Sequence, residues 1–253
     1  MTEAGQLESA RTRWYSRWFG EAYLQLYPHR DREEAERAVA LVLEHAPVPE
    51  GARVLDIACG AGRHLSALRD RGVRPVGLDL SETLLRVGRR DHPDIPVVRG
   101  DMRRLPFDSG AFDLVTSFFT SFGYFPEMAE DRQVLGEARR VLTPGGRFAF
   151  DFLNARRVRA LLQPRDERVL EGRRVVQTRR LVEDDQVVEK RIEIHAGGGS
   201  PDVFYERVRL YAPEELEVML ERGGFIPLER FGDYDGTPLE DDSPRVILLG
   251  RAR

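Results

Sequence analysis

Short apolar runs alternate with segments of helical periodicity through the middle of the chain. The strand-like runs occupy residues 53–58, 74–79, 96–99, 112–117 and 147–152. Between them apolar residues recur at helical spacing, most clearly in the segment that ends at Pro144-Gly145. Strands joined by helical crossovers form a parallel sheet with helices on both faces. The pattern therefore predicts a doubly wound α/β fold.

The first fifty residues follow a different pattern, in which aromatic side chains gather at helical spacing. We expect one helix over residues 14–27, where Trp14 and Trp18 are four positions apart and Pro28 ends the run. A second apolar helix follows and stops at Pro47.

The residues after 154 show partial alternation of apolar and polar positions. Segments 173–182, 186–195 and 203–211 are separated by an acidic turn and a glycine-rich turn, which predicts an inserted antiparallel β meander. A helix over 213–222 and strands near 225–230 and 245–250 are expected to complete the main sheet.

The composition narrows the range of functions. The chain has 39 Lys+Arg and 43 Asp+Glu for a formal net charge of −4, and Lys190 is its only lysine. A mildly acidic chain is not expected to bind polyanions in general, and the arginine preference is typical of a GC-rich, bacterial genome. No apolar run is long enough to span a membrane or resembles a signal peptide, so we expect a cytoplasmic protein. With Cys59 as the only cysteine, a disulfide scaffold and a multi-cysteine zinc site are excluded, and no metal is expected.

The clearest chemical motif is the glycine-rich turn Cys59-Gly60-Ala61-Gly62, which follows an apolar strand and opens a helix. Glycines let the backbone turn sharply and a ligand approach it closely. By itself the turn could be an ordinary strand-to-helix connection. At or just after the ends of the next two strands, however, lie acidic residues, Asp79 and Asp101. Ligands of such sheets bind at the carboxyl ends of the strands, so the three strand ends predict an adenosine pocket.

The same motifs indicate which adenosine cofactor is bound. A dinucleotide fingerprint would place a third glycine where this chain has Leu65, and the acid Asp56 before the turn suits an amino-bearing ligand. The sequence resembles the class I S-adenosylmethionine-dependent methyltransferases over about residues 35–153, and again over 213–253. The matching segments are 56–62, 77–81, 100–102, 112–115 and 142–148.

This resemblance implies a Rossmann-like, mostly parallel seven-stranded sheet whose last strand is antiparallel. It implies S-adenosyl-L-methionine as cofactor and S-adenosyl-L-homocysteine as product, with the methionine part at the glycine turn, the ribose at Asp79 and the adenine at Asp101 and Met102. The full set of expected cofactor-binding residues is Asp56, Ala58, Gly60, Gly62, Asp79, Leu80, Asp101, Met102, Ser117 and Phe118. We add Arg30 as a hypothesis, because a bidentate guanidinium suits the cofactor carboxylate; the alternative is a solvated arginine.

The resemblance also implies a division into three parts. We expect a helical lid over residues 1–50, a cofactor-binding core over 51–153 and 213–253, and an inserted substrate subdomain over 154–212. A looser similarity to small-molecule N- and O-methyltransferases of the glycine and aminosugar types favours a small-molecule acceptor. The chain is expected to act as a monomer or a homodimer.

Methyl transfer from a sulfonium mainly requires alignment and exclusion of water, which aromatic side chains can provide. The expected substrate-pocket residues are Trp14, Trp18, Phe119, Phe122 and Tyr124, with core packing as the alternative. Candidate proton acceptors or substrate anchors are Tyr15, Tyr23, His29 and His195, although no spacing supports a catalytic over a structural role. Cys59 is interpreted as a small buried residue rather than a nucleophile.

Two other functions remain open from the sequence. Nine arginines between residues 155 and 182 could form a basic face for RNA or a protein substrate. An acidic stretch follows directly, so a nucleic-acid partner is not the preferred interpretation. A protein that binds the cofactor without catalysis is the second alternative.

Overall fold

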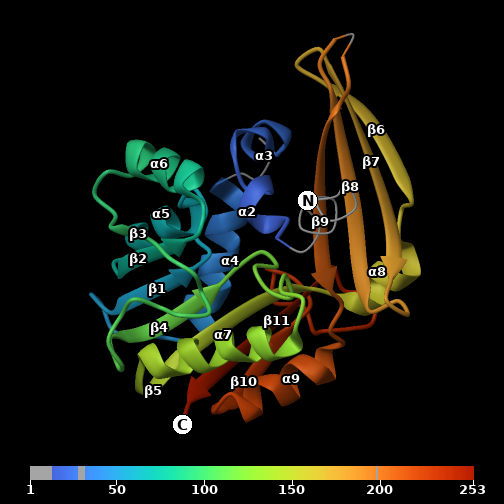
Figure 1. The fold of residues 1–253 in the computed structure, drawn as a ribbon. Helices are drawn as coiled ribbons and strands as arrows, with labels where there is room; N and C mark the ends of the chain where they lie inside the picture. The colour runs from blue at the N-terminus through green and yellow to red at the C-terminus, as the bar shows by residue number, and fades with distance from the viewer. Residues whose placement is uncertain (1–12, 28–31, 198) are drawn as a thin grey trace.

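The computed structural model describes residues 13–27, 32–197 and 199–253, which form two β-sheets and the helices around them (Figure 1). Sheet A contains β1 (Arg53–Ile57), β2 (Arg74–Asp79), β3 (Val97–Arg99), β4 (Phe112–Ser117), β5 (Leu142–Leu153), β10 (Phe225–Phe231) and β11 (Arg245–Ala252). Sheet B contains β6 (Arg165–Leu170), β7 (Arg173–Val182), β8 (Val187–His195) and β9 (Asp202–Arg209). The helices are α2 (Tyr15–Trp18), α3 (Glu21–Leu26), α4 (Arg32–His45), α5 (Arg63–Asp70), α6 (Glu82–Asp91), α7 (Met128–Val141), α8 (Ala155–Leu161) and α9 (Pro213–Arg222).

Sheet A confirms the doubly wound fold. Its strand order is β10-β11-β5-β4-β1-β2-β3, and β11 runs antiparallel to both of its neighbours. The chain builds outward from β1 to β3, then crosses back to β4 on the other side of β1. Such a reversal of strand order opens a crevice at the carboxyl ends of the strands.

Helices cover both faces of sheet A. Successive residues of a strand point to opposite faces, so neighbouring strand residues pack against different helices. Leu55 of β1 packs with residues of α7 and α9, whereas its neighbour Val54 packs with α4 and α5. The near-continuous apolar strands that the sequence shows are those of a sheet buried on both faces. Within the described residues, no helix combines the length and the apolar character needed to cross a membrane.

The aromatic segment near the N-terminus differs from the expected single helix over 14–27. It forms two short helices, α2 and α3, separated at Phe19 and Gly20. Gly20 has φ −137° and ψ −155°, an extended backbone that ends the helical repeat. The side chain of Ser81 donates a hydrogen bond to the Phe19 carbonyl oxygen, so the break is tied to the start of α6.

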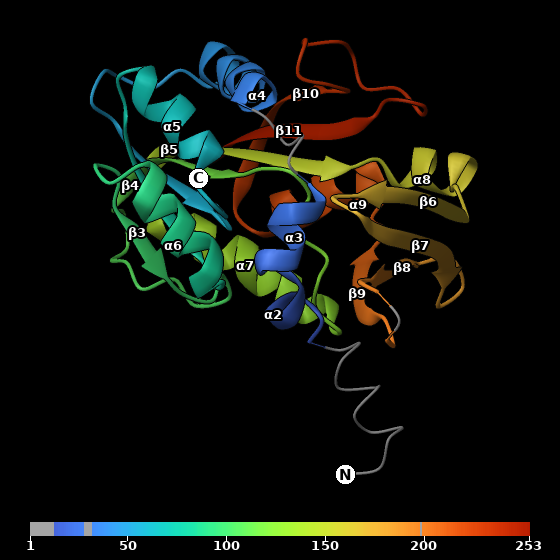
Figure 2. The same cartoon turned by 90° about the horizontal axis from the view of Figure 1, so that it is seen from above.

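Sheet B is the inserted antiparallel meander, with four strands instead of the three expected. The strand β6 was not expected, because it is an edge strand that begins with four consecutive charged residues and shows no alternation of apolar and polar positions. In both views α2 and α3 lie between the α/β layers and sheet B (Figure 1, Figure 2). Val175, Ile192 and Ile194 of sheet B pack there against Trp14 and Trp18.

Candidate functional site

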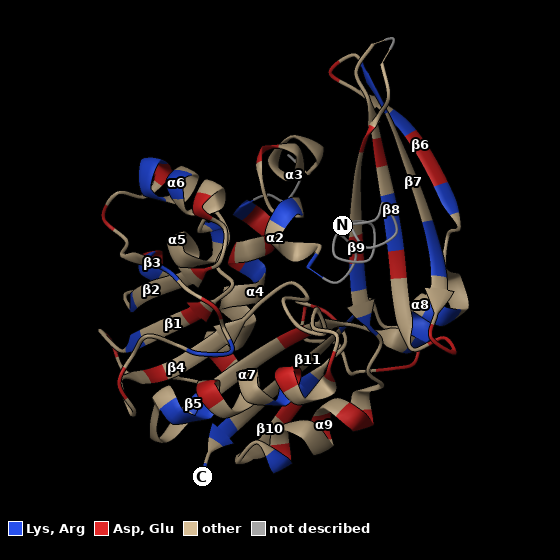
Figure 3. Cartoon of the chain, viewed as in Figure 1, with Lys and Arg blue, Asp and Glu red and all other residues tan. Residues whose placement is uncertain are grey.

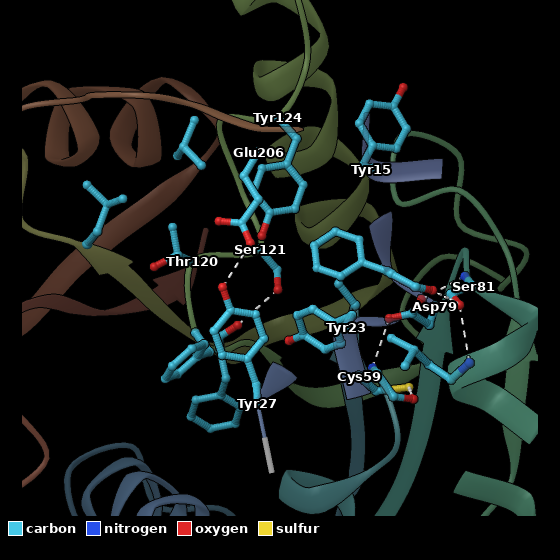
Figure 4. Close-up of a pocket in the computed structure, with 18 of the residues that line it drawn as sticks. Tyr15, Tyr23, Tyr27, Cys59, Asp79, Ser81, Thr120, Ser121, Tyr124 and Glu206 are labelled. Atoms are coloured by element: carbon cyan, nitrogen blue, oxygen red, sulfur yellow. Dashed lines mark hydrogen bonds between the residues drawn. The ribbon is translucent and has the colours of Figure 1, made fainter. Parts of the chain in front are cut away.

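A cavity of about 850 Å³ lies where the carboxyl ends of the sheet A strands meet α2, α3 and sheet B. This volume falls in the range of small-molecule sites. Figure 4 shows its two ends: Cys59, Asp79 and Ser81 lie on one side of Tyr23, and Tyr27 and Glu206 lie on the other. We call these the sheet A end and the sheet B end.

The glycine-rich turn forms the floor of the sheet A end. Ala58, Gly60 and Gly62 all have positive φ, of 58°, 58° and 87°, a conformation that glycine adopts without strain. The turn lies directly on β2, since a Cβ on Gly77 would come within 2.5 Å of the Cys59 sulfur. Cys59 is therefore a small, buried packing residue, and burial raises the pKa of its thiol well above the usual range.

Asp79 is fixed at the end of β2 by two backbone amides. Its Oδ2 accepts a hydrogen bond from Gly60 N and its Oδ1 accepts one from Ser81 N, both at 2.8 Å. Burial raises the pKa of the Asp79 carboxyl. Each carboxylate oxygen has a second lone-pair site, so Asp79 can accept two ligand hydroxyls while it holds the turn. Ala58, Gly60 and Leu80 line the cavity beside it.

Asp101 and Met102 line the next part of the cavity, beyond β3. The Arg103 guanidinium donates from Nε to Asp101 Oδ1 at 3.0 Å, and this contact lowers the pKa of the Asp101 carboxyl. Arg103 also lies over the Phe125 ring at 4.4 Å. Asp101 is thus held ionised and in a fixed orientation at the cavity surface.

Three expected cofactor residues, Asp56, Gly62 and Ser117, do not line the cavity. Asp56 is fully buried behind the turn, where Thr116 Oγ1 donates to its Oδ1 at 2.8 Å. Burial raises the pKa of this carboxyl to about 7. Any effect of Asp56 on a ligand in the cavity therefore acts through space. Direct contact of Asp56, Gly62 and Ser117 with a ligand in this cavity, which the sequence led us to expect, does not fit their positions.

Phe118 does line the cavity, and it stacks on a histidine that the sequence analysis overlooked. The rings of His64 and Phe118 are 4.3 Å apart at an angle of 19°. The Nε2 atom of His64 is buried and, among the described residues, has no hydrogen-bond partner. The Nε1 atom of Trp14, another lining residue, is also buried and has no hydrogen-bond partner among the described residues. A ligand in the cavity could supply the partner that such buried polar atoms require.

The loop after β4 enters the cavity in a strained conformation. Phe119 and Thr120 have φ of 60° and 65°, which is uncommon for residues other than glycine. The buried Asp151 holds this loop, because its Oδ2 accepts from Phe119 N at 2.7 Å. Arg245 pairs with Asp151 at 2.7 Å and donates to Thr120 Oγ1 at 3.1 Å. Neither Asp151 nor Arg245 belongs to a local motif, so the sequence analysis did not find them.

The expected substrate-pocket residues divide into two groups. Trp14, Phe119 and Tyr124 line the cavity, and the Trp14 and Tyr124 rings are 4.8 Å apart. Trp18 and Phe122 do not line it. Trp18 is fully buried against Phe204, at 5.1 Å between ring centroids, and Phe122 packs 5.0 Å from Phe150 in the core. For these two residues the alternative of core packing holds.

The candidate proton acceptors are also separated. Tyr15 and Tyr23 line the cavity, and burial raises the pKa of the Tyr15 hydroxyl. His195 lies at the end of β8, where its Nε2 is 3.1 Å from Glu193 Oε2, and it does not line the cavity. His29 and Arg30 lie outside the described residues.

The sheet B end carries a charged group that the sequence analysis missed. Lys190 of β8 and Glu206 of β9 form an ion pair inside the cavity lining. Lys190 Nζ donates to the Tyr27 hydroxyl at 2.9 Å, and Trp18 Nε1 donates to Glu206 at 2.6 Å. These residues are far apart along the chain, so no local spacing could reveal the group.

The nine arginines between residues 155 and 182 do not form a uniformly basic face. Figure 3 shows basic and acidic bands interleaved along sheet B. Arginines that pair with carboxylates are Arg156, Arg165, Arg174, Arg179 and Arg180. Those that donate to carbonyl or amide oxygens are Arg157, Arg159, Arg168 and Arg173.

Comparison with known proteins gives matches for the part of the chain that forms the sheet A end. A family model described as a methyltransferase domain matches residues 54–146. A demethylmenaquinone methyltransferase of Renibacterium salmoninarum is 40% identical over 107 residues, which cover 42% of this chain and 44% of the relative. The dTDP-4-amino-2,3,4,6-tetradeoxy-D-glucose N,N-dimethyltransferase of Saccharopolyspora spinosa is 33% identical over 134 residues, 52% of this chain and 53% of the relative. The chain thus spans about half the length of the curated relatives that it matches.

Solved structures match over nearly the whole chain. The CcbJ methyltransferase from Streptomyces caelestis has a TM-score of 0.79 at 22% identity, with 94% of this chain and 98% of the other covered. The sugar N-methyltransferase KedS8 from Streptoalloteichus sp. has a TM-score of 0.70 at 26% identity, with 92% and 94% covered. The fold, including sheet B, is therefore shared with these proteins.

Proposed function

We propose that the chain is a class I S-adenosylmethionine-dependent methyltransferase that transfers a methyl group to a nitrogen or oxygen atom of a small molecule. Its residues 54–146 match a methyltransferase domain. The observation that supports this most is one continuous cavity that joins the glycine-rich turn and Asp79 to Glu206 of sheet B. A single continuous space lets a cofactor at one end and an acceptor at the other meet in line.

The residues of the sheet A end fit S-adenosylmethionine. Asp79 can accept the ribose hydroxyls, Asp101 and Met102 can contact the adenine, and the turn at Gly60 allows close approach. Within the part of the chain that the structure describes, His64 Nε2 and Trp14 Nε1 have no hydrogen-bond partner, and a bound ligand could satisfy them. When bound, S-adenosylmethionine supplies a methyl group already activated on a sulfonium sulfur.

The chain contributes orientation and exclusion of water. Phe118, Phe119 and Tyr124 line the cavity, and aromatic rings attract cationic groups while they displace water. Asp151 and Arg245 fix the loop that carries Phe119. Tyr15 and Tyr23 are our candidates for contact with the acceptor. In this proposal the N-terminal helices and sheet B cover the reacting groups.

A ligand-binding experiment tests the proposal. S-adenosylhomocysteine at about 100 times its dissociation constant should stabilise the protein by about 2.7 kcal/mol, which raises the Tm by roughly 5–10 °C for a chain of this size. NAD should give no shift, and labelled S-adenosylmethionine should transfer its methyl group to a small-molecule fraction. The absence of any shift with S-adenosylhomocysteine would contradict the proposal.

A further inference from the structure

Lys190 differs in type from every other basic residue of this chain. It is the only lysine among 39 basic residues. It lies on β8 in the cavity lining, with 15% of its side chain exposed. An arginine would place a wider, planar group there, whereas an ammonium is a compact donor on a flexible stem.

Lys190 belongs to a compact polar group. Lys190 and Glu206 are cross-strand partners in the register of β8 and β9, and their side chains form an ion pair. Lys190 Nζ also donates to Tyr27 Oη at 2.9 Å, and Glu206 Oε1 accepts from Trp18 Nε1 at 2.6 Å. The group thus joins β8 and β9 of sheet B to Trp18 and Tyr27 of the N-terminal aromatic segment.

The surroundings on the same face of the sheet are apolar. Along β8, Val188 and Ile192 flank Lys190 two positions away, and along β9, Phe204 and Val208 flank Glu206. An ion pair in such surroundings is not a strong source of stability, because desolvation offsets the attraction between the charges. On the other side of Lys190, Arg179 is already held by Asp166. Stabilisation of the fold therefore does not by itself account for the ion pair between Lys190 and Glu206.

We propose that Lys190, Glu206 and Tyr27 form the site that recognises a hydroxylated, ring-shaped acceptor, an inference that rests on the proposed methyltransferase function. A hydroxyl group both donates and accepts a hydrogen bond, so it matches a carboxylate and an ammonium side by side. A quinone carbonyl only accepts and would leave Glu206 without a new partner. The rings of Tyr23 and Tyr124, which line the same cavity, suit the apolar face of the acceptor ring.

The test compares loss of the pair with its reversal. The variants are Lys190→Met, Glu206→Gln and the double exchange K190E/E206K. Arg207→Met is the matched control, because Arg207 lies on the opposite face of sheet B, forms ion pairs with Glu183 and Glu189, and has a side-chain exposure of 19%. The hydroxylated probes are glucosamine and nucleoside-diphosphate 3-amino- and 4-amino-6-deoxyhexoses, and 1,4-naphthoquinone is the carbonyl probe.

We expect at least one hydroxylated probe to bind the protein loaded with S-adenosylhomocysteine and to be methylated when S-adenosylmethionine is supplied. Each single variant should lower kcat/KM about 10- to 100-fold, mainly through KM, as expected for loss of a charged hydrogen bond. The exchange should recover part of the Tm lost in the single variants, because it restores the ion pair but places an ammonium opposite Trp18 Nε1. It should leave KM impaired, because the donor and acceptor have traded places. Arg207→Met should leave KM unchanged.

Restoration of KM by the exchange would overturn the proposal, since recognition of the acceptor requires the donor at position 190 and the carboxylate at position 206. It would also be overturned if the naphthoquinone bound and none of the hydroxylated probes did, or if no probe bound at all. These failures leave binding of S-adenosylhomocysteine intact. Failure of the proposed function itself would appear as loss of that binding in the unaltered protein.

Discussion

The two ends of the cavity are built in different ways. The sheet A end is made by strand ends and turns within residues 54–102, and its key carboxylate, Asp79, is oriented by the backbone amides of Gly60 and Ser81. The sheet B end is made by side chains on separate elements, since Tyr27 lies 163 positions from Lys190 and 179 from Glu206. One end depends on backbone geometry and the other on side-chain identity.

This difference agrees with the part of the chain that the methyltransferase-domain family model matches. The matched segment, residues 54–146, contains the turn and the ends of β1 to β4 and excludes sheet B. A backbone cradle needs the same few small residues in every protein that uses it, whereas side chains on an inserted sheet can change with the acceptor. We therefore expect changes at the sheet A end to affect the cofactor and changes at the sheet B end to affect the acceptor.

A large separation between the two ends is expected from Gly77→Ala. The added Cβ would lie 2.5 Å from both Cys59 Sγ and Leu65 Cδ1 and 3.1 Å from Cys59 Cβ, so the Cys59 and Leu65 side chains must shift, and we expect the turn that carries Cys59 to shift with them. Overpacking of this kind costs about 1–3 kcal/mol, or roughly 3–10 °C in Tm, and we expect the affinity for S-adenosylhomocysteine to fall at least about 10-fold.

Gly136→Ala is the control for Gly77→Ala, because Gly136 lies within α7 with open space around its Cα. It should stabilise the protein by about 0.5–1 kcal/mol and leave ligand affinity unchanged. Equal ligand affinities in the two variants, measured by calorimetry, would show that the turn does not depend on the close contact with β2.

A smaller effect is expected from Thr120→Gly. Thr120 has φ 65°, so glycine relieves backbone strain while it removes the contact with Arg245. The Tm should stay level or rise, whereas kcat/KM for the acceptor should fall several-fold as the loop loosens. Asp184→Gly, at φ 53° in the turn between β7 and β8, should give the gain in Tm without the loss in activity. A fall in S-adenosylhomocysteine affinity for Thr120→Gly would place this loop with the sheet A end instead.

The smallest effect concerns pH and Asp56. In the folded chain its pKa is about 7, above the usual 3.8, so the folded state holds this proton more tightly than the unfolded state. The resulting stability is present below about pH 4 and is lost as the pH rises to about 7. Asp56→Asn keeps an acceptor for Thr116 and should flatten the dependence of Tm on pH between 5 and 8, by about 3 °C or more. Parallel curves for both proteins would contradict the raised pKa.

Much of the fold was predictable because it follows from local patterns. The apolar strands of sheet A, the turn at Gly60, and the N-cap at Ser81, whose side chain accepts from Leu84 N, are each encoded by neighbouring residues. The break of the N-terminal helix at Gly20 and the charged edge strand β6 were missed. A glycine or a run of charged residues weakens the periodic pattern of apolar positions, but it does not indicate which structure forms there instead.

The candidate site was predictable only in part, for the same reason. Asp79, Asp101 and Met102 follow strand ends, so the sequence could point to them, and they line the cavity. Lys190, Glu206 and Arg245 reach the cavity through tertiary packing. Trp18 and Phe122 show the converse, because an aromatic residue in the right segment can face either the cavity or the core. Which way it faces depends on sheet B and on β5, far away in the sequence.

Calorimetric titration of S-adenosylhomocysteine into three proteins tests the division of the cavity most directly. Asp79→Ala removes both acceptors for the ribose hydroxyls, and it should raise the Kd about 100-fold or more relative to the unaltered chain. Lys190→Met should leave the Kd within about twofold, because Lys190 lies at the sheet B end. If Lys190→Met weakened the cofactor analogue as much as Asp79→Ala did, or if neither changed its Kd, the two-ended account would be contradicted.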